Sequence, residues 1–330
     1  MGAMLLPILG LLIGVLGLLW GADRFVEGSA GAARNFGISP LIIGLTVVSI
    51  GTSAPEVLVS INAALSNAAE LAVGNALGSN MANIGLVLGA TLLIAPTPVQ
   101  KHLLTQEGAV LLVITAIAGF CLYDGYLGRI ESAILAGLIF PLVYIAIRYK
   151  KTHVSPEEVA IGEDIPDITM GAAVLWFIVG LAVLLASAEV TVWSAKTIAQ
   201  SLGISELIIG LTVVAIGTSL PELAASVVSA MRGHHDIAIG NVFGSNLFNL
   251  MLVMPAAGII SPMTISPMVF NRDFASLAIM TLLLIAMVAL ALNKARRNSL
   301  PAVLSRYLGA ILVAGYIGYY VVLWPAIVGN

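Results

Sequence analysis

Two glutamates stand in the middle of long apolar stretches, each at the end of the same short motif. Glu56 closes the sequence GTSAPE of residues 51–56, and Glu222 closes GTSLPE of residues 217–222. Neither stretch contains a Lys or Arg, so each carboxylate would bring uncompensated negative charge into an apolar medium, which is costly. The pattern predicts that a bound cation or a proton neutralises these two side chains.

Prolines inside the motifs predict a broken helix at each glutamate. Pro55 has no N–H, so the carbonyl four residues earlier loses its helical partner. The break frees backbone carbonyls and brings hydroxyls beside the carboxylate, those of Thr52 and Ser53 in the first motif and of Thr218 and Ser219 in the second. Each glutamate then begins a second half-helix, whose positive dipole end favours the ionised side chain. A simple proline kink with incidental polar residues is the alternative interpretation.

A second motif supplies further oxygen atoms at helical spacing. It reads GNALGSNMAN over residues 74–83 and GNVFGSNLFN over residues 240–249. Its candidate ligands, which share a helix face in each copy, are Ser79, Asn83, Ser245 and Asn249. Hydroxyl, amide and carboxylate oxygens are hard ligands that suit calcium or sodium rather than zinc or copper. Interhelical hydrogen bonding is the alternative role for these residues.

Both motifs belong to an internal repeat. Residues 38–89 align without gaps to residues 204–255, and 27 of the 52 positions are identical. The matched positions include many polar residues, whereas packing alone would preserve apolar ones. Each half of the chain holds an odd number of predicted spans, so the second copy should lie upside down relative to the first. Inverted repeats are typical of secondary transporters, whose sites lie at the repeat interface near the midplane.

The composition predicts a protein embedded in a membrane. Hydrophobic residues make up 59% of the 330 residues and charged residues only 9%, whereas soluble domains average roughly 25% charged residues. These values exclude a soluble enzyme and a nucleic-acid binder, and the single cysteine excludes a disulfide framework. A transmembrane helix needs about 20 apolar residues. Ten predicted spans approach or exceed that length: residues 4–20, 38–66, 71–95, 107–123, 131–148, 170–188, 204–231, 236–260, 274–292 and 303–325.

The predicted fold is an all-α membrane protein of ten transmembrane helices, arranged as two inverted five-helix repeats with broken helices at the midplane. The first half covers residues 1–148, a cytoplasmic linker covers 149–169, and the second half covers 170–330. Basic residues concentrate on the cytoplasmic side of membrane proteins. If the N-terminus lies outside, eleven of the 14 Lys and Arg residues fall on the inner side. Both termini are therefore predicted to lie outside the cytoplasm.

The paired motifs resemble those of the calcium/cation antiporter superfamily, and in particular the compact prokaryotic sodium/calcium exchangers, which have no large regulatory loop. The pattern GxxxxxxGTSxPE begins at Gly44 and Gly210, and GNxxGSNxxN begins at Gly74 and Gly240. The resemblance implies exchange of sodium for calcium by alternating access, in which the first span of each half slides across the core. Proton/calcium exchange, or exchange of another divalent cation, is the alternative that uses the same glutamates.

The resemblance also implies a role for each residue of the motifs. Glu56 and Glu222 would bind calcium at the centre, and the two competing ions would share them. The other implied contributors are the oxygens of Thr52 and Thr218 at the calcium position, Ser53, Ser79, Ser219 and Ser245 at flanking sodium positions, Asn83 and Asn249 in the middle, and the backbone carbonyls of Ser49 and Ala215. Several relatives carry an acidic residue where Asn249 stands, notably the potassium-dependent branch. The amide therefore argues against potassium co-transport.

Other function classes are a channel and a membrane-embedded enzyme that uses the glutamates as acid and base. Catalytic carboxylates usually occupy unlike environments, whereas the sequences around Glu56 and Glu222 are near-duplicates. We therefore expect a transporter of the prokaryotic inner membrane and not an enzyme. Calcium and sodium would be its substrates, with no cofactor. The lipid bilayer would surround it, with no nucleic-acid partner and no obligate protein partner.

Overall fold

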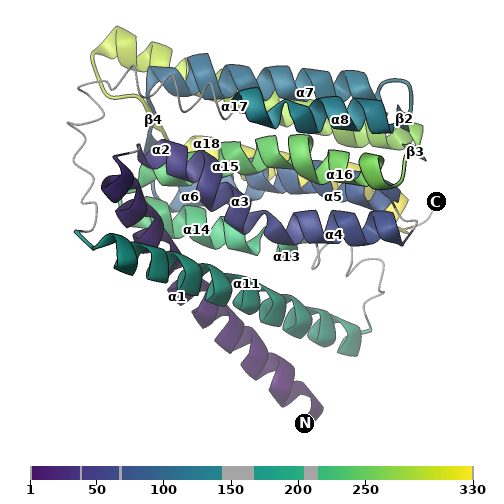
Figure 1. Ribbon diagram of the computed structural model, residues 1–330, viewed down its shortest axis with the longest axis horizontal. Coiled ribbons are helices and arrows are strands. Elements are labelled where there is room, and N and C mark those ends of the chain that lie inside the picture. Colours follow the sequence, from purple (N-terminus) through teal and green to yellow (C-terminus); the bar gives the residue numbers. More distant parts are fainter. Residues whose placement is uncertain (1, 38, 67–68, 143–166, 204–214, 329–330) are drawn as a thin grey trace.

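The computed structural model describes residues 2–37, 39–66, 69–142, 167–203 and 215–328, and these residues are almost entirely helical (Figure 1). π-Helical turns are labelled η. The first half contains α1 (Gly2–Phe36), α2 (Pro40–Ile43), η1 (Gly44–Val48), α3 (Ser49–Thr52), α4 (Ala54–Leu65), α5 (Ala69–Ala82), η2 (Asn83–Leu88), α6 (Gly89–Ile94), β1 (Thr97–Pro98), η3 (Leu103–Gly108), α7 (Ala109–Leu122), β2 (Tyr126–Leu127) and α8 (Arg129–Gly137). The second half contains α11 (Met170–Ser201), α13 (Ala215–Thr218), α14 (Leu220–Met231), α15 (His235–Phe248), η5 (Asn249–Val253), α16 (Met254–Ile260), β3 (Met263–Thr264), η6 (Val269–Phe274), α17 (Ala275–Asn298), β4 (Val303–Leu304) and α18 (Arg306–Val328).

Within the described residues, seven helical segments are long and apolar enough to cross a membrane, and the bent pair formed by α2–α3 and α4 makes an eighth. These eight segments correspond to eight of the ten predicted spans. The other two predicted spans, residues 131–148 and 204–231, lie partly outside the described residues. The mainly helical membrane fold is confirmed, and the count of ten helices stays a prediction.

The predicted ends of the first span of each half are wrong. The first span is predicted to end at residue 20, but α1 continues to Phe36, and α11 likewise continues past residue 188 to Ser201. The part of α1 beyond residue 20 contains charged residues, and Arg24 among them has partners in the fold. The Arg24 guanidinium donates to Glu27 Oε2 at 2.7 Å and lies 4.8 Å from the centre of the Trp176 ring. Such contacts lower the cost of holding a charged group against apolar helices.

The two halves share irregular features at equivalent positions. The π-helical turns η2 and η5 begin 166 residues apart, and so do η3 and η6. β1 pairs with β4, whereas β3, the equivalent of β1, pairs with β2. Figure 1 shows β4 and β3 at opposite ends of the molecule, so the equivalent segments α5–α6 and α15–α16 run in opposite directions. This arrangement supports the predicted duplication, while its orientation in a membrane stays a prediction.

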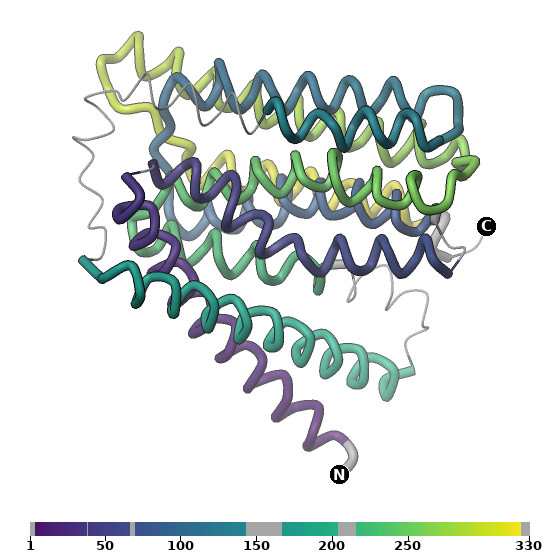
Figure 2. The backbone as a smooth tube through the Cα atoms, in the orientation of Figure 1, coloured from purple at the N-terminus to yellow at the C-terminus, as the bar shows by residue number. Residues whose placement is uncertain are grey.

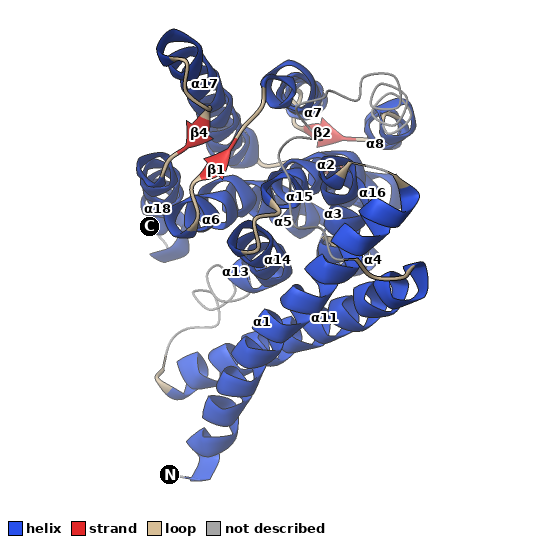
Figure 3. Cartoon of the chain, turned by 90° about the vertical axis from the view of Figure 1, so that its left-hand side faces the viewer, coloured by secondary structure: helices blue, strands red, loops and turns tan. Residues whose placement is uncertain are grey.

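The segments that carry the second motif form the centre of the bundle. The spans Glu70–Ile94 and His235–Ile260 are the most deeply buried of the seven, whereas α1, α11 and α18 are largely exposed. Figures 2 and 3 show α1 and α11 lying together on one side of the bundle. The fold therefore places the motif residues inside and leaves the first helix of each half at the periphery.

Close packing at the centre depends on glycine. A Cβ placed on Gly240 would lie 2.7 Å from Leu41 O and 3.0 Å from Gly44 Cα, so α15 can approach η1 only without a side chain there. Gly244, one turn later, faces Ser49 and Leu45 in the same way. These contacts confirm the small-residue face of the second motif copy. The segment equivalent to η1 in the second half, residues 210–214, lies outside the described residues.

Replacing Gly240 with alanine tests this contact. Because neither Leu41 O nor Gly44 Cα is the end of a flexible side chain, we expect Gly240→Ala to destabilise the fold by about 1–3 kcal/mol through overpacking. Gly318→Ala is the matched control, since Gly318 meets no described atom within 4 Å and is exposed. Thermal unfolding of the detergent-purified variants checks both. Equal melting temperatures would contradict the close approach.

Candidate cation site

The helix breaks predicted at the two prolines are present, and their geometry is the same in both halves. α3 ends at Thr52 and α4 begins at Ala54, with a bend of 45° between the two helical parts. Ser53, at the break, has φ −84° and ψ 6°, and its equivalent Ser219 has φ −89° and ψ 4°. Proline in the first turn of each following helix has no N–H to leave unpaired. Each motif therefore ends one short helix and starts another just before its glutamate.

Both glutamates point into the interior. Glu56 is 1% exposed and Glu222 is fully buried. The Ser53 hydroxyl donates to Glu222 Oε1 at 3.0 Å, so the first motif directly contacts the carboxylate of the second. No described Lys, Arg or His forms an ion pair with either carboxylate.

Asparagines of the second motif hold the glutamate-bearing helices in place. Asn75 Nδ2 donates to the Glu56 carbonyl at 3.4 Å, and Asn241 Nδ2 donates to the Glu222 carbonyl at 3.3 Å and to Ser226 Oγ at 2.9 Å. Asn241 Oδ1 also accepts the Thr52 hydroxyl at 3.1 Å. These bonds tie α5 to α4, α15 to α14, and the first half to the second. An asparagine of this motif could either coordinate an ion or form an interhelical hydrogen bond, and the contacts of Asn75 and Asn241 favour the second role.

Several predicted ligand atoms are buried and have no hydrogen-bond partner among the described residues. Buried polar groups in native proteins are nearly always paired, so the oxygens among these atoms are candidate ligands. Carboxylate, hydroxyl and amide oxygens can all coordinate a cation. The oxygen atoms concerned are Glu56 Oε2, Glu222 Oε2, Ser219 Oγ, Ser245 Oγ and the Oδ1 atoms of Asn83 and Asn249.

The other predicted ligands, Ser49, Ser79, Thr218 and Ala215, differ from one another in burial and in hydrogen bonding. The Ser49 carbonyl already accepts the Ser53 amide at 3.0 Å and lies 3.4 Å from the Thr52 hydroxyl. Ser79 is buried, and Thr218 is half-buried at the end of α13. Ala215 begins α13, and its side chain lies outside the described part of the chain.

Further buried polar residues were not singled out as ligands from the sequence. Ser226 contacts Asn241, and the side chains of Ser60, Ser229 and Asn80 each hold a buried atom without a partner in the described chain. Ser60 and Ser226 are equivalent positions of the repeat, and Asn80 is equivalent to Asn246. Identity between the two copies was the signal that could have found Ser60, Ser226 and Asn80, whereas Ser229 is equivalent to Ala63 and gave no such signal.

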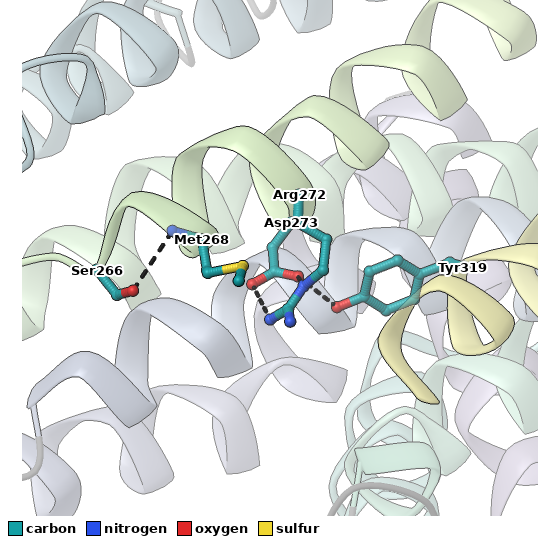
Figure 4. A network of polar contacts seen from close by, with 5 residues as sticks. All are labelled: Ser266, Met268, Arg272, Asp273 and Tyr319. Atoms are coloured by element: carbon teal, nitrogen blue, oxygen red, sulfur yellow. Dashed lines mark hydrogen bonds and ion pairs between the residues drawn. The ribbon is translucent and has the colours of Figure 1, made fainter. Parts of the chain in front are cut away.

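A buried carboxylate elsewhere in the molecule provides a contrast. Asp273 is 7% exposed and accepts two hydrogen bonds from the Arg272 guanidinium, at 2.7 and 3.0 Å, and one from the Tyr319 hydroxyl at 3.0 Å (Figure 4). Asp273 is therefore neutralised by its neighbour. Glu56 and Glu222 have no such partner, and within the described residues no three His, Cys, Asp or Glu side chains gather to hold a metal. A cation at this site would be held by two carboxylates and neutral oxygens.

Comparison with known proteins matches nearly the whole chain. The family described as "Sodium/calcium exchanger protein" matches residues 6–149 and 172–324. The putative antiporter CaxA of Alkalimonas amylolytica is 42% identical, with 98% of this chain and 100% of that protein covered. The inner membrane protein YrbG of Escherichia coli K12 is 38% identical, with 97% and 98% covered. The solved structure of the sodium-calcium exchanger NCX_Mj superposes with a TM-score of 0.81 at 32% identity, with 96% and 98% covered.

The hydrogen bond from Thr52 to Asn241 joins the two halves, and a double-mutant cycle can measure it. We expect Thr52→Val and Asn241→Ala each to lower the free energy of unfolding by about 1–3 kcal/mol, because each leaves a buried polar group unpaired. The double variant should lose less than the sum, with a coupling of about 1 kcal/mol. Unfolding in mixed micelles gives the values.

Thr115→Val combined with Asn241→Ala is the control pair. The Thr115 hydroxyl donates to Leu111 O in its own helix, so its effect should add to that of Asn241→Ala. Additive effects of Thr52→Val and Asn241→Ala would show that the bond between the halves contributes nothing to stability.

Proposed function

The chain belongs to the sodium/calcium exchanger family, and on that premise we propose that it exchanges sodium for calcium across the membrane by alternating access. The observation that carries this proposal is the pair Glu56 and Glu222, both buried without a basic partner among the described residues, with the Ser53 hydroxyl of the first motif on the Glu222 carboxylate of the second. Two buried negative charges require about two positive charges for neutrality. One calcium ion or a small number of sodium ions supplies them, so the two substrates compete for one site.

We assign the ligands accordingly. Glu56 and Glu222 bind calcium, assisted by the oxygens of Thr52 and Thr218. Sodium ions occupy flanking positions that share these carboxylates. The residues assigned to the flanking and central positions are Ser53, Ser79, Ser219, Ser245, Asn83 and Asn249, with the backbone carbonyls of Ser49 and Ala215. Calcium accepts six to eight oxygen ligands in flexible geometry, and the broken helices offer an irregular set of this kind.

Alternating access would come from movement of α1 and α11 against the bundle. These helices carry neither motif and meet through small residues. A Cβ on Gly21 would lie 2.7 Å from Leu184 N, and Gly10 faces the Ser194 side chain. Close packing of this kind holds the two helices together as one unit, and movement of that unit against the bundle would belong to the shear class of motion. The Asp23–Arg232 ion pair, at 2.5 Å, connects α1 to the end of α14 in the position seen here.

We also propose the topology that the sequence predicts. Residues 1–148 and 170–330 form the two inverted halves, residues 149–169 form a cytoplasmic linker, and both termini lie outside the cytoplasm. The eight apolar segments place the chain in a membrane, and the relative YrbG is named as an inner membrane protein. We therefore assign the chain to the prokaryotic inner membrane, with no protein partner required for exchange.

Exchange of protons for calcium, or for another divalent cation, is the second candidate. The observation that favours it is the burial of both carboxylates without a basic partner among the described residues, because a proton neutralises a buried carboxylate as a metal ion does. The name of the relative CaxA specifies only an antiporter. The two candidate functions use the same glutamates and differ in the ion whose gradient drives calcium transport.

Glu56→Gln and Glu222→Gln test the site. Each change removes one of the two central charges but keeps the size of the side chain, so calcium transport should fall at least about 100-fold. Radioactive calcium uptake into proteoliposomes measures this. Glu70→Gln is the matched control, because Glu70 is exposed and a glutamine keeps its hydrogen bond from the Ser266 amide. Full uptake by both site variants would overturn the assignment.

The driving ion is tested with wild-type protein. Vesicles loaded with sodium and diluted into sodium-free buffer should accumulate calcium, whereas potassium-loaded vesicles should not. Uptake that follows a pH gradient and ignores sodium would replace sodium exchange with proton exchange at the same site. Vesicles that contain Glu222→Gln, under the same sodium gradient, are the control for calcium that enters without the transporter.

A further inference from the structure

Several cations without an ion-pair partner among the described residues lie at one end of the bundle. β1 and β4 pair there, with Val99 N donating to Ala302 O at 2.9 Å just beyond the strands. This pairing brings the segment after β1 together with the turn between α17 and α18, as Figure 3 shows. We call the result the basic end. Its five exposed cations are Lys101, Lys294, Arg296, Arg297 and Arg306.

The cations of the basic end lack acidic partners. No ion pair joins any of the five to another described residue, and the sequence from Phe274 to Asn330 contains no Asp or Glu. Arg306 donates only to the Ile94 carbonyl, at 3.3 Å. Arginines elsewhere differ, since Arg34 and Arg232 each pair with an aspartate. Clustered like charges repel one another unless an anion lies between them.

The opposite end shows that the fold does not require this charge. There β2 pairs with β3, the arrangement equivalent to that of β1 and β4. Carboxylates dominate that end: Asp124 accepts the Tyr126 amide at 3.0 Å, and Glu70 accepts the Ser266 amide at 2.9 Å. Arg129 is its exposed cation. The end at β2 and β3 therefore lacks the cluster of exposed cations found at the basic end.

Exposed apolar side chains accompany the cations. Tyr307 is 84% exposed and Leu300 is 63% exposed, and both lie in the segment that carries Arg297 and Arg306. The buried Thr97 and Leu304 side chains anchor the strand pair beneath them. Side chains that combine apolar surface with positive charge at a helix end fit the boundary between headgroups and acyl chains.

We propose that the basic end binds the phosphate of an anionic phospholipid in the membrane leaflet that it faces. Arg296 and Arg297 can each donate paired N–H groups to phosphate oxygens, while lysines contribute point charge. The apolar residues favour a lipid over a soluble anion, because they would contact its acyl chains. The bound lipid would link the turn between α17 and α18 to the segment that follows β1. This proposal is independent of which ion drives transport.

Native mass spectrometry of the full chain with phosphatidylglycerol and phosphatidylcholine tests the proposal. We expect the wild type to retain phosphatidylglycerol selectively, and Arg296→Gln/Arg297→Gln to bind it about 25-fold less, since each cation near an anionic surface contributes about fivefold. Lys294→Gln/Arg306→Gln provides an independent variant in case the first fails to fold. Arg129→Gln/Lys196→Gln removes the same charge elsewhere and should change nothing.

Three outcomes would overturn the proposal. Equal retention of the two lipids by the wild type would show that the headgroup charge is not recognised. Undiminished phosphatidylglycerol binding by a folded variant of the basic end would show that these cations are not the site. Displacement of the lipid by an equal concentration of inorganic phosphate would identify a site for a small soluble anion instead.

Discussion

The structure depends on two carboxylates that an apolar bundle must hold without a basic side chain. An isolated charge in a low-dielectric interior is among the most costly groups a protein can bury. Asp273 is a buried carboxylate that the chain stabilises with its own side chains, because Arg272 and Tyr319 both donate hydrogen bonds to it. Glu56 and Glu222 have no basic partner among the described residues, and the printed contact of a carboxylate here is the Ser53 hydroxyl on Glu222. A neutral hydroxyl cannot cancel the charge, and the proposed function assigns that task to the transported cation.

Duplication explains how one chain positions both carboxylates. Each copy contributes a broken helix with its glutamate in the first turn after the break, and a central helix that carries the asparagines. The bonds from Ser53 to Glu222 and from Thr52 to Asn241 both cross between the halves. Because the copies run in opposite directions, the same oxygen atoms approach the centre from both ends of the molecule. Neither half holds a complete site, and assembly of the site requires the fold of the whole chain.

The sequence predicted the parts of the site that follow from local chemistry. Pro55 removes a hydrogen-bond donor wherever it stands, so the break before Glu56 was readable from the motif. The π-helical turns that begin at Asn83 and Asn249 were not, since their i to i+5 bonding arises from packing within the bundle. The role of Asn241 also escaped a firm prediction. An amide side chain can coordinate an ion or form a hydrogen bond to a neighbouring helix. Only the positions of Thr52 and Ser226 in the folded chain distinguish these two roles for Asn241.

Symmetry holds at the centre and fails toward the ends, and the proposed exchange accounts for the difference. A single site that opens to either side must present the same ligands to both, which favours near-identical motifs around Glu56 and Glu222. Glu107 and Asp273 are equivalent positions farther out, both buried in matched π-helical turns, yet one faces His102 and the other Arg272. Under the proposed exchange, segments there would not meet the substrate from both sides. Each end would border only one membrane face, so the charge of the two ends could diverge on one duplicated scaffold.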